Sequence, residues 1–308
     1  MQDIIPAIPT EVLKAELTEK TFVRKANFGN RSIHIVDANS APNVLLEIGR
    51  LRELAFRSAG GGTGLAIDLD EYDSGQNPFQ QLIIWGEEEQ QILGGYRYQL
   101  GEILLKNTDG HYNSPTAHLF HYQDKFIQDF LPYCVELGRS FIVPSQQAGS
   151  GQKGSIYTLD NLWDGLGAIA LRHSDMQYFF GKVTMYPTYN AKARDMILYF
   201  MQKYCPDPDN LMMPHEPLIL STPNEELVQI FTGGNFKADY RILSKEVRTK
   251  GETIPPLVNA YMKLSPTMRS FGTAINHPFG AVEETGILIT LDDIYEEQKE
   301  RHMKVKHK

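Results

Sequence analysis

The sequence predicts an α/β protein in which a mixed, mostly antiparallel central sheet is flanked by helices. Short runs rich in β-branched and aromatic residues recur along the chain, and longer segments with helical spacing of apolar residues separate them. The runs at residues 81–85 and 91–100 flank Gly86 and an acidic turn, which indicates an antiparallel hairpin. The chain has 308 residues, of which 42% are hydrophobic, so it can bury a sizeable core.

Local patterns predict the order of the elements. Ile33 and Ile35 indicate a first strand over residues 31–38, and Pro42 opens a helix over residues 43–57 that ends before three glycines. The other expected strands cover residues 81–85, 91–100, 133–143, 177–185 and 286–291, and the other expected helices cover residues 121–130, 159–172, 190–204, 225–231 and 255–264.

A cluster of prolines between residues 206 and 223 predicts a boundary in the chain. We therefore expect a core over residues 1–205 and a mixed α+β C-terminal extension over residues 206–308 that packs on this core.

Charge and cysteine content exclude several classes of protein. The formal net charge of -8 argues against a nucleic-acid-binding protein. Only Cys134 and Cys205 are present, so neither a disulfide framework nor a structural zinc site is expected, and a cytoplasmic location fits best. No stretch is apolar enough to span a membrane, although the basic residues 299–308 could either touch an anionic membrane surface peripherally or remain solvated.

Two charged residues interrupt the apolar strand expected over residues 133–143. Glu136 and Arg139 would be costly to bury unless they are paired or take part in function. Positions three apart in a regular strand face opposite ways, so the two side chains meet only if a bulge shifts the alternation, and Gly138 favours a bulge. The alternative is an edge strand with solvated charges.

The loop after this strand contains a glycine-rich pattern. Gln146, Gly149 and Gly151 follow Val143 in a Gln-x-x-Gly-x-Gly arrangement ahead of a helix. Glycines let the backbone approach an anion, and a helix N-terminus attracts one, so the loop could bind a phosphate. An ordinary flexible loop explains the same residues.

Further charged residues lie upstream. Arg52 and Phe56 are four residues apart on the first helix, Asp70 and Asp73 follow in an acidic turn, and Arg97 lies on the third strand. Each is ordinary alone. Together they supply the cations and carboxylates that could position an amine carrying a carboxylate.

Other nucleophile and metal interpretations are weaker. Cys134 has no histidine near it in the sequence, which favours a buried structural thiol over a nucleophile. The spacing of His118, His121 and His173 fits no metal-binding motif, so no metal is expected.

The ordered series resembles a known family. The arginine, acidic pair, arginine and Glu-Leu-Gly-Arg strand are similar to those of the hemolysin-like, ornithine-lipid-synthase branch of the GNAT superfamily, and the same order is found in acyl-homoserine-lactone synthases. Within this branch the chain looks most like the N-acyl amino acid synthases, including N-acylglycine synthases. The matching segments are residues 52–56, 70–73, 95–97, 136–139, 162–166, 180–184, 257–264 and 276–280.

This resemblance implies a GNAT-like acyl-CoA N-acyltransferase fold and an enzyme that moves a long-chain acyl group, with or without a 3-hydroxyl, to the amine of an amino acid such as glycine or ornithine. The donor would be an acyl-phosphopantetheine, on acyl carrier protein or on CoA, with no tightly bound cofactor. The expected catalytic residues are Glu136 and Arg139, the expected substrate-binding residues are Arg52, Phe56, Asp70, Asp73, Arg97 and Trp163, and the expected contacts to the donor come from Val143, Gln146, Gly149 and Gly151.

The expected mechanism is direct attack of the amine on the thioester. Glu136 is the favoured base, because burial raises the pKa of a carboxylate, whereas Arg139 would lower it. Strands that diverge near Phe179 would hold the pantetheine arm, and a backbone N–H near Phe141 or Ile142 would stabilise the oxyanion. An acetyl-CoA-dependent or O-acylating enzyme and a non-catalytic lipid-binding protein remain alternatives.

Overall fold

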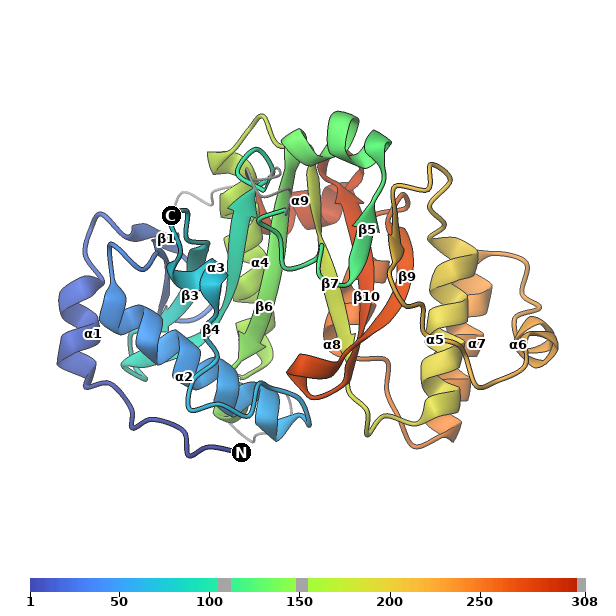
Figure 1. Cartoon of the computed structure of the whole chain (residues 1–308), viewed down its shortest axis with the longest axis horizontal. Helices are drawn as coiled ribbons and strands as arrows, with labels where there is room; N and C mark the ends of the chain where they lie inside the picture. Colours follow the sequence, from blue (N-terminus) through green and yellow to red (C-terminus); the bar gives the residue numbers. More distant parts are fainter. Residues whose placement is uncertain (105–111, 148–154, 304–308) are drawn as a thin grey trace.

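An eight-stranded sheet forms the centre of the molecule in the computed structural model, which describes residues 1–104, 112–147 and 155–303. The strand order is β1-β2-β3-β4-β6-β7-β10-β9, and every neighbouring pair is antiparallel except β6 and β7, which are parallel. Figure 1 shows the sheet crossing the molecule from the N-terminal strands to β9. The predicted fold class, a mixed and mostly antiparallel sheet with flanking helices, is confirmed.

The strands have the following bounds: β1 Phe22–Lys25, β2 Arg31–Val36, β3 Gln80–Gly86, β4 Gln91–Leu100, β6 Cys134–Ile142, β7 Tyr178–Met185, β9 Arg269–Asn276 and β10 Val282–Thr290. A separate two-stranded sheet pairs β5, Phe120–Tyr122, with β8, Met212–Pro214.

The helices are α1 Thr10–Glu16, α2 Pro42–Ser58, α3 Glu71–Ser74, α4 Ser155–Arg172, α5 Ala191–Tyr204, α6 Asn224–Ile230, α7 Phe236–Thr249, α8 Pro256–Met262 and α9 Glu296–His302. A π-helix covers Phe126–Phe130, and 3-10 turns cover Leu131–Tyr133, Pro144–Gln146, His277–Phe279 and Leu291–Asp293.

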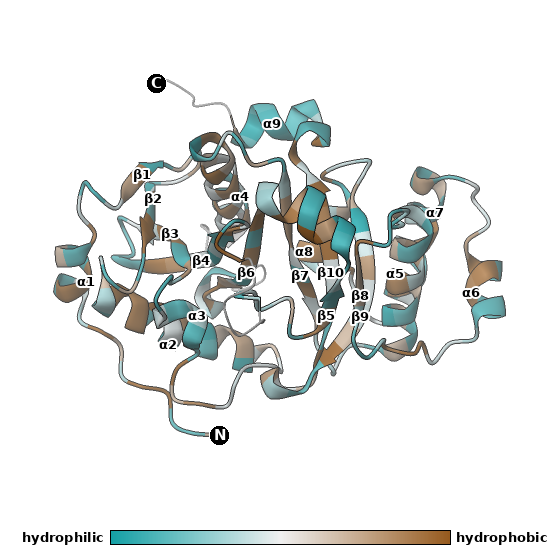
Figure 2. Ribbon diagram, turned by 45° about the horizontal axis from the view of Figure 1, so that its top comes forward, coloured by the Kyte–Doolittle hydropathy of each residue, from teal (hydrophilic) through white to brown (hydrophobic). Residues whose placement is uncertain are grey.

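Helices cover both faces of the sheet because the strand side chains alternate. On β3, Leu82 and Ile84 belong to the core cluster that contains residues of α4, whereas Ile83 and Trp85 belong to the cluster that contains residues of α2. Hydrophobic residues concentrate along the strands in Figure 2, while α9 is mostly hydrophilic. Hydrophobic side chains of α2 and α4 therefore bury opposite faces of β3.

The segment expected as a helix over residues 121–130 is different. Its first part is β5, in which Phe120 and Tyr122 are buried beside β8 while His121 is exposed, and only the last five residues are helical, as a π-helix. The alternation of buried and exposed side chains has period 2, so tertiary pairing overrides the helical interpretation. The other expected elements are present within a few residues of their predicted bounds, whereas α1, α3, α7, α9, β1, β8 and β9 had not been expected.

The segment after residue 205 contributes two strands to the central sheet. β10 pairs with β7 along its whole length, and β9 pairs with β10. The expected extension therefore continues the sheet of the core, and its division at residue 205 stays a prediction.

No helix within residues 1–104, 112–147 and 155–303 combines the length and the apolar content needed to cross a membrane. The last five residues of the basic C-terminal stretch lie outside the described part of the chain, so peripheral membrane contact stays a prediction.

Candidate active site

The central sheet opens between β6 and β7, the parallel pair among its described strands. β6 and β7 pair from Cys134 and Tyr178 to Leu137 and Gly181, and beyond this point the two strands have no further partners in each other. A Cβ atom on Gly181 would lie 2.2 Å from the Leu137 carbonyl oxygen, so only glycine allows this close approach at the point of divergence. A cavity of about 540 Å³ lies at the opening.

A β-bulge shapes β6 at the opening. Gly138 is aligned with Arg97 of β4, but Phe141 is aligned with Gly95, so two residues of β6 lie opposite one residue of β4. Arg139 is one of the two, and its φ of 48° lies in the left-handed region, which is unusual for a residue other than glycine. The predicted bulge is therefore present.

Glu136 lies on the floor of this cavity and is 3% exposed. Its Oε1 accepts hydrogen bonds from the Thr116 N–H, at 2.9 Å, and from the Thr116 hydroxyl, at 2.5 Å. Its Oε2 is buried and has no hydrogen-bond partner within the described part of the chain. Burial raises the pKa of Glu136, and the positive charge of Lys182 opposes that rise only in part. This carboxylate is thus suited to take up a proton.

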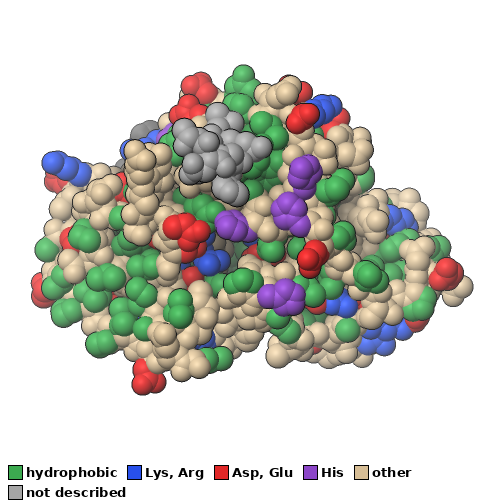
Figure 3. Space-filling model, viewed as in Figure 1, with side chains coloured by type: hydrophobic (Ala, Val, Ile, Leu, Met, Phe, Trp, Pro, Cys, Tyr) green, Lys and Arg blue, Asp and Glu red, His purple; other side chains and the backbone are tan. Residues whose placement is uncertain are grey.

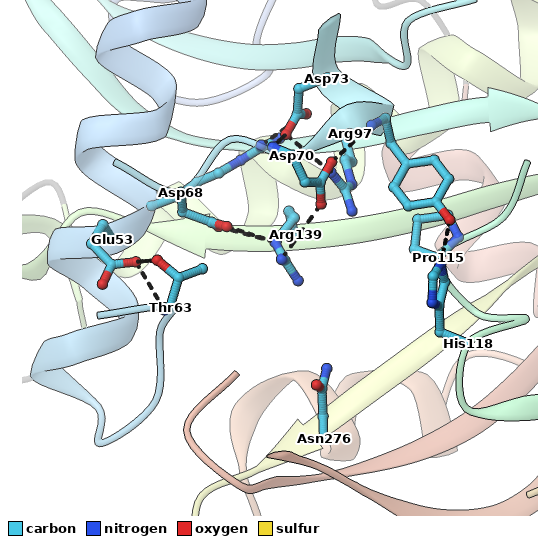
Figure 4. A network of polar contacts seen from close by, with 12 residues as sticks. Glu53, Thr63, Asp68, Asp70, Asp73, Arg97, Pro115, His118, Arg139 and Asn276 are labelled. Carbon is cyan, nitrogen blue, oxygen red and sulfur yellow. Dashed lines mark hydrogen bonds and ion pairs between the residues drawn. The ribbon is translucent and has the colours of Figure 1, made fainter. Parts of the chain in front are cut away.

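Arg139 pairs with acidic side chains of the segment that joins α2 to α3. Its Nε lies 2.9 Å from Asp68 Oδ2, its Nη2 lies 3.6 Å from Asp70 Oδ2, and its guanidinium stacks 4.1 Å from the centre of the Phe279 ring. Figure 4 shows the contacts of Arg139 with Asp68 and Asp70. The bulge brings both charges to one cavity, but the two charges do not pair with each other as the sequence had suggested.

Arg52, Asp73 and Arg97 form a buried cluster beside Arg139. Arg52 Nη1 lies 3.0 Å from Asp73 Oδ1, and Arg97 Nη1 lies 3.0 Å from Asp73 Oδ2 and 2.6 Å from Asp70 Oδ1. Although burial raises the pKa of Asp73, the charges of Arg52 and Arg97 outweigh that effect and hold the pKa well below its usual range. The sequence-predicted set is thus brought together in space, with Asp70 as the N-cap of α3.

A second cavity, of about 440 Å³, lies next to the first. The two cavities share four lining residues: Arg97, Pro115, Arg139 and Lys182. Lys182 donates to the Pro115 carbonyl at 2.9 Å and lies 3.7 Å from Glu284 Oε2. On the surface, Figure 3 shows a hollow containing a cation, with acidic and histidine side chains around it. Two compartments therefore meet beside a set of cations and the Glu136 carboxylate.

The rim of the second cavity carries a pair of aromatic side chains. The hydroxyl of Tyr72 lies 2.5 Å from Nε2 of His118, and the two rings meet edge to face. Asn276, at the end of β9, lines the same cavity and donates to Glu284 at 3.1 Å.

The loop after β6 differs from the expectation in one respect. The Val143 N–H donates to the Leu93 carbonyl at 3.0 Å, so it is not available to a phosphate. Gln146 lines the first cavity, and its side-chain oxygen accepts from Arg31 at 3.2 Å. Gly149 and Gly151 lie outside the described residues, so the phosphate-binding loop stays a prediction.

The two aromatic residues expected to bind substrate lie in different places. Phe56 lines the first cavity and packs edge to face on Phe279, with ring centres 5.1 Å apart. Trp163 lies in the main core on α4, with its ring 5.1 Å from that of Tyr261, and lines a separate small cavity together with Phe179. Trp163 is therefore not part of the charged cluster.

Sequence reasoning predicted no role for Thr116 or for Lys182, although Lys182 lies in the matching segment over residues 180–184. Thr116 lies 20 residues from Glu136 in a segment without a recognisable pattern, and Lys182 looks like an ordinary strand lysine. The predicted structural role of Cys134 agrees with its complete burial, which raises the pKa of its thiol well above the usual range. Within the described ranges, no group of three or more histidine, cysteine or acidic side chains is placed to hold a metal ion.

Comparison with known proteins places this arrangement in a family. Residues 51–155 match the acetyltransferase (GNAT) domain. The chain is 54% identical to a glycine Nα-acyltransferase of Bacteroides thetaiotaomicron, over 98% of this chain and 90% of that protein. It is 51% identical to a glycine Nα-acyltransferase of Phocaeicola vulgatus, over 98% of this chain and 93% of that protein.

Among solved structures, the AHL synthase LasI aligns over 91% of this chain and 100% of its own, with 13% identity and a TM-score of 0.41, which is too low to carry an argument. The chain belongs to the GNAT acyltransferase family that includes these two glycine Nα-acyltransferases.

Proposed function

We propose that this enzyme transfers a long-chain acyl group from acyl carrier protein to the α-amine of an amino acid, with glycine as the preferred acceptor over ornithine. One observation carries the proposal: two cavities meet at Arg97, Pro115, Arg139 and Lys182, next to the buried Glu136 carboxylate. A transfer between two substrates needs two compartments with a shared wall. The names of the two relatives favour glycine.

The acceptor occupies the second cavity in this proposal. The guanidinium of Arg139 is held at Nε by Asp68 and stacked on Phe279, which fixes its plane beside the cavity. A planar, oriented guanidinium suits bidentate binding of a carboxylate. Arg139 therefore binds the carboxylate of the amino acid, and Lys182 adds a second positive charge at the shared wall.

The donor occupies the first cavity. Its thioester carbonyl lies where β6 and β7 diverge, and its acyl chain follows the apolar residues beyond the opening, among them Leu137, Phe179 and Tyr261. Trp163 lies behind this apolar wall, in a separate small cavity that shares Phe179 with it. Gln146, which lines this cavity, contacts the phosphate end of the arm, and a backbone N–H at the bulge stabilises the oxyanion.

The reaction is a direct displacement. The ammonium form of the amino acid gives one proton to Glu136 Oε2, and the neutral amine then attacks the thioester carbon, so that a C–N bond forms and the C–S bond breaks. The pantetheine thiolate leaves with the second proton lost by the nitrogen, and Glu136 releases its proton to solvent, which regenerates the carboxylate. The raised pKa of Glu136 favours the first step, and the shared wall supplies proximity.

A product assay tests the proposal. The protein is incubated with a long-chain acyl carrier protein and an equimolar mixture of amino acids, and the products are identified by mass spectrometry. We expect N-acylglycine together with free holo-carrier protein, in equal amounts. An O-acyl product, or turnover with acyl-CoA and none with the carrier protein, would contradict the acceptor or the donor, respectively.

A further inference from the structure

Helix α7 presents a row of cations on one face. Lys237, Arg241, Lys245 and Arg248 are all exposed, and their spacing of four, four and three residues places them on a single side of the helix. Arg241, Lys245 and Arg248 also line a surface groove. We call these four residues the α7 basic face.

The α7 basic face has no acidic partner. None of its four cations forms an ion pair with any described residue, although the chain as a whole carries a formal charge of -8. The acidic Asp239 of the same helix is buried on the other side, where it pairs with Lys203 at 2.8 Å. Glu246 is the other acid of α7 and is half-buried. A concentrated positive surface on an acidic protein attracts an acidic partner.

The C-terminal end of α7 is connected to the donor cavity. Residues 250–255 lead from α7 to Pro255, Pro256 and Leu257, which line that cavity. This connection is fastened near the end of β7, because Tyr189 donates to the Thr253 carbonyl at 2.9 Å and the Asn190 N–H donates to Glu252 at 3.0 Å. Six residues lie between Arg248 and Pro255, and the chain from one to the other spans at most roughly 25 Å.

We propose that the α7 basic face is the docking surface for the acidic carrier protein that delivers the acyl thioester. This inference rests on the carrier-protein donor of the proposed function. Exposed charges steer association with an oppositely charged protein and fix its register. A carrier bound at α7 places its arm beside the cavity wall formed by the start of α8.

The packing of α7 favours a protein partner over a lipid surface. A helix that binds a membrane interface inserts an apolar face between the lipids. The apolar residues of α7, including Leu243 and Val247, are buried against the protein and cannot insert. The outward side offers charge alone, which matches a row of carboxylates on a protein.

Charge reversal tests the docking surface. The double variant Arg241→Glu/Lys245→Glu is compared with the full-length enzyme, using two donors with the same acyl chain: the acyl carrier protein and the carrier-free acyl-pantetheine. We expect the KM for the carrier protein to rise about tenfold or more, because like charges now face each other. The kcat, and all activity with acyl-pantetheine, stay within twofold.

The matched control is Lys20→Glu/Arg172→Glu, which changes the net charge equally at two exposed sites outside α7. An equal rise of KM in the control, or no rise in the α7 variant, overturns the proposal.

Direct binding of holo-carrier protein to both variants, measured by calorimetry, gives a readout that does not need turnover. If the wild-type enzyme uses acyl carrier protein and the α7 variant uses it equally well, only the docking proposal fails; if the wild-type enzyme does not use acyl carrier protein, the donor of the proposed function fails. Loss of sedimentation with phosphatidylserine vesicles in the α7 variant, with carrier binding unchanged, would assign the surface to a membrane instead.

Discussion

Two groups of buried charges lie side by side in this enzyme and differ in how fully they are satisfied. In the first group, Asp73 receives hydrogen bonds from Arg52, Arg97 and Gln81, and its pKa is held low. In the second, Glu136 has one oxygen without a partner in the described chain, and its pKa is raised. Saturated charges hold the walls of the site, whereas incompletely satisfied ones keep the capacity to exchange a proton.

The largest expected effect is on turnover in Glu136→Gln. Glutamine keeps the shape and can still accept from Thr116, but it cannot take a proton from the amine. We expect kcat to fall by about 10²- to 10⁴-fold, measured by product formation with saturating substrates. Glu102→Gln, at an exposed position, should leave kcat unchanged. Full activity in Glu136→Gln would remove this carboxylate from the chemistry.

Next in size is the cost of breaking the saturated group. Arg52→Ala leaves Asp73 with an uncompensated part of its charge in a site that is completely buried. We expect a loss of about 3–5 kcal/mol in the free energy of unfolding, measured by urea denaturation. Arg172→Ala, at an exposed position, should change that free energy by less than about 0.5 kcal/mol. If the two variants are equally stable, the cluster does not hold the walls.

A smaller effect, on the KM for the amino acid, is expected when Arg139 is changed. Arg139→Lys keeps a positive charge near Asp68 but loses the planar fork and the stacking on Phe279. We expect the KM for the amino acid to rise about 10- to 100-fold, with the KM for the acyl donor unchanged, in initial-rate measurements. An increase in the donor KM alone would assign Arg139 to the other compartment.

The smallest expected effect is on stability: the contributions of Asp73 and Glu136 to the free energy of unfolding should depend on pH in opposite ways. The pKa of Asp73 is lowered on folding, so its contribution to stability is present above its unfolded pKa of about 3.9 and is lost as pH falls toward the folded value. The pKa of Glu136 is raised, so its contribution is present below about pH 4.3 and is lost as pH rises through the folded value.

Urea unfolding between pH 4 and pH 8 separates the contributions of Asp73 and Glu136 to stability. Relative to wild type, Glu136→Gln should gain stability as pH rises over this range, because glutamine has no charge to bury. Asp73→Asn should be destabilised throughout it, and this deficit should shrink only in stronger acid. Parallel curves for Glu136→Gln and wild type would show that burial of the Glu136 charge costs nothing.

Local sequence patterns were sufficient to predict much of the sheet and the helices α2, α4 and α5. The helix at α2 and the hairpin of β3 and β4 were predicted because their apolar spacing and turns are local properties. β9 was not, because Gly272, with a φ of 89°, and polar residues interrupt its alternation. The place of β9 in the sheet depends on its pairing with β10, and a local sequence pattern gives no information about that pairing.

The same limit applies to the site. Glu136 and Arg139 stood out because charges are costly within an apolar strand, and Gly138 indicated the bulge between them. Their actual partners are far away in the sequence: Arg139 contacts Asp68 from 71 residues away. Thr116 and Lys182 have no unusual feature in the sequence, so only the folded chain shows that they contact or face the carboxylate.

The position of β10 between β7 and β9 has a consequence for synthesis. β7 is made long before β10, and until β10 emerges from the ribosome one edge of β7 has no strand to pair with. Lys182, on β7, also lacks its neighbour Glu284 during that time. The newly made chain therefore carries an open sheet edge for about a hundred residues of translation, a stage at which a chaperone would have most to protect.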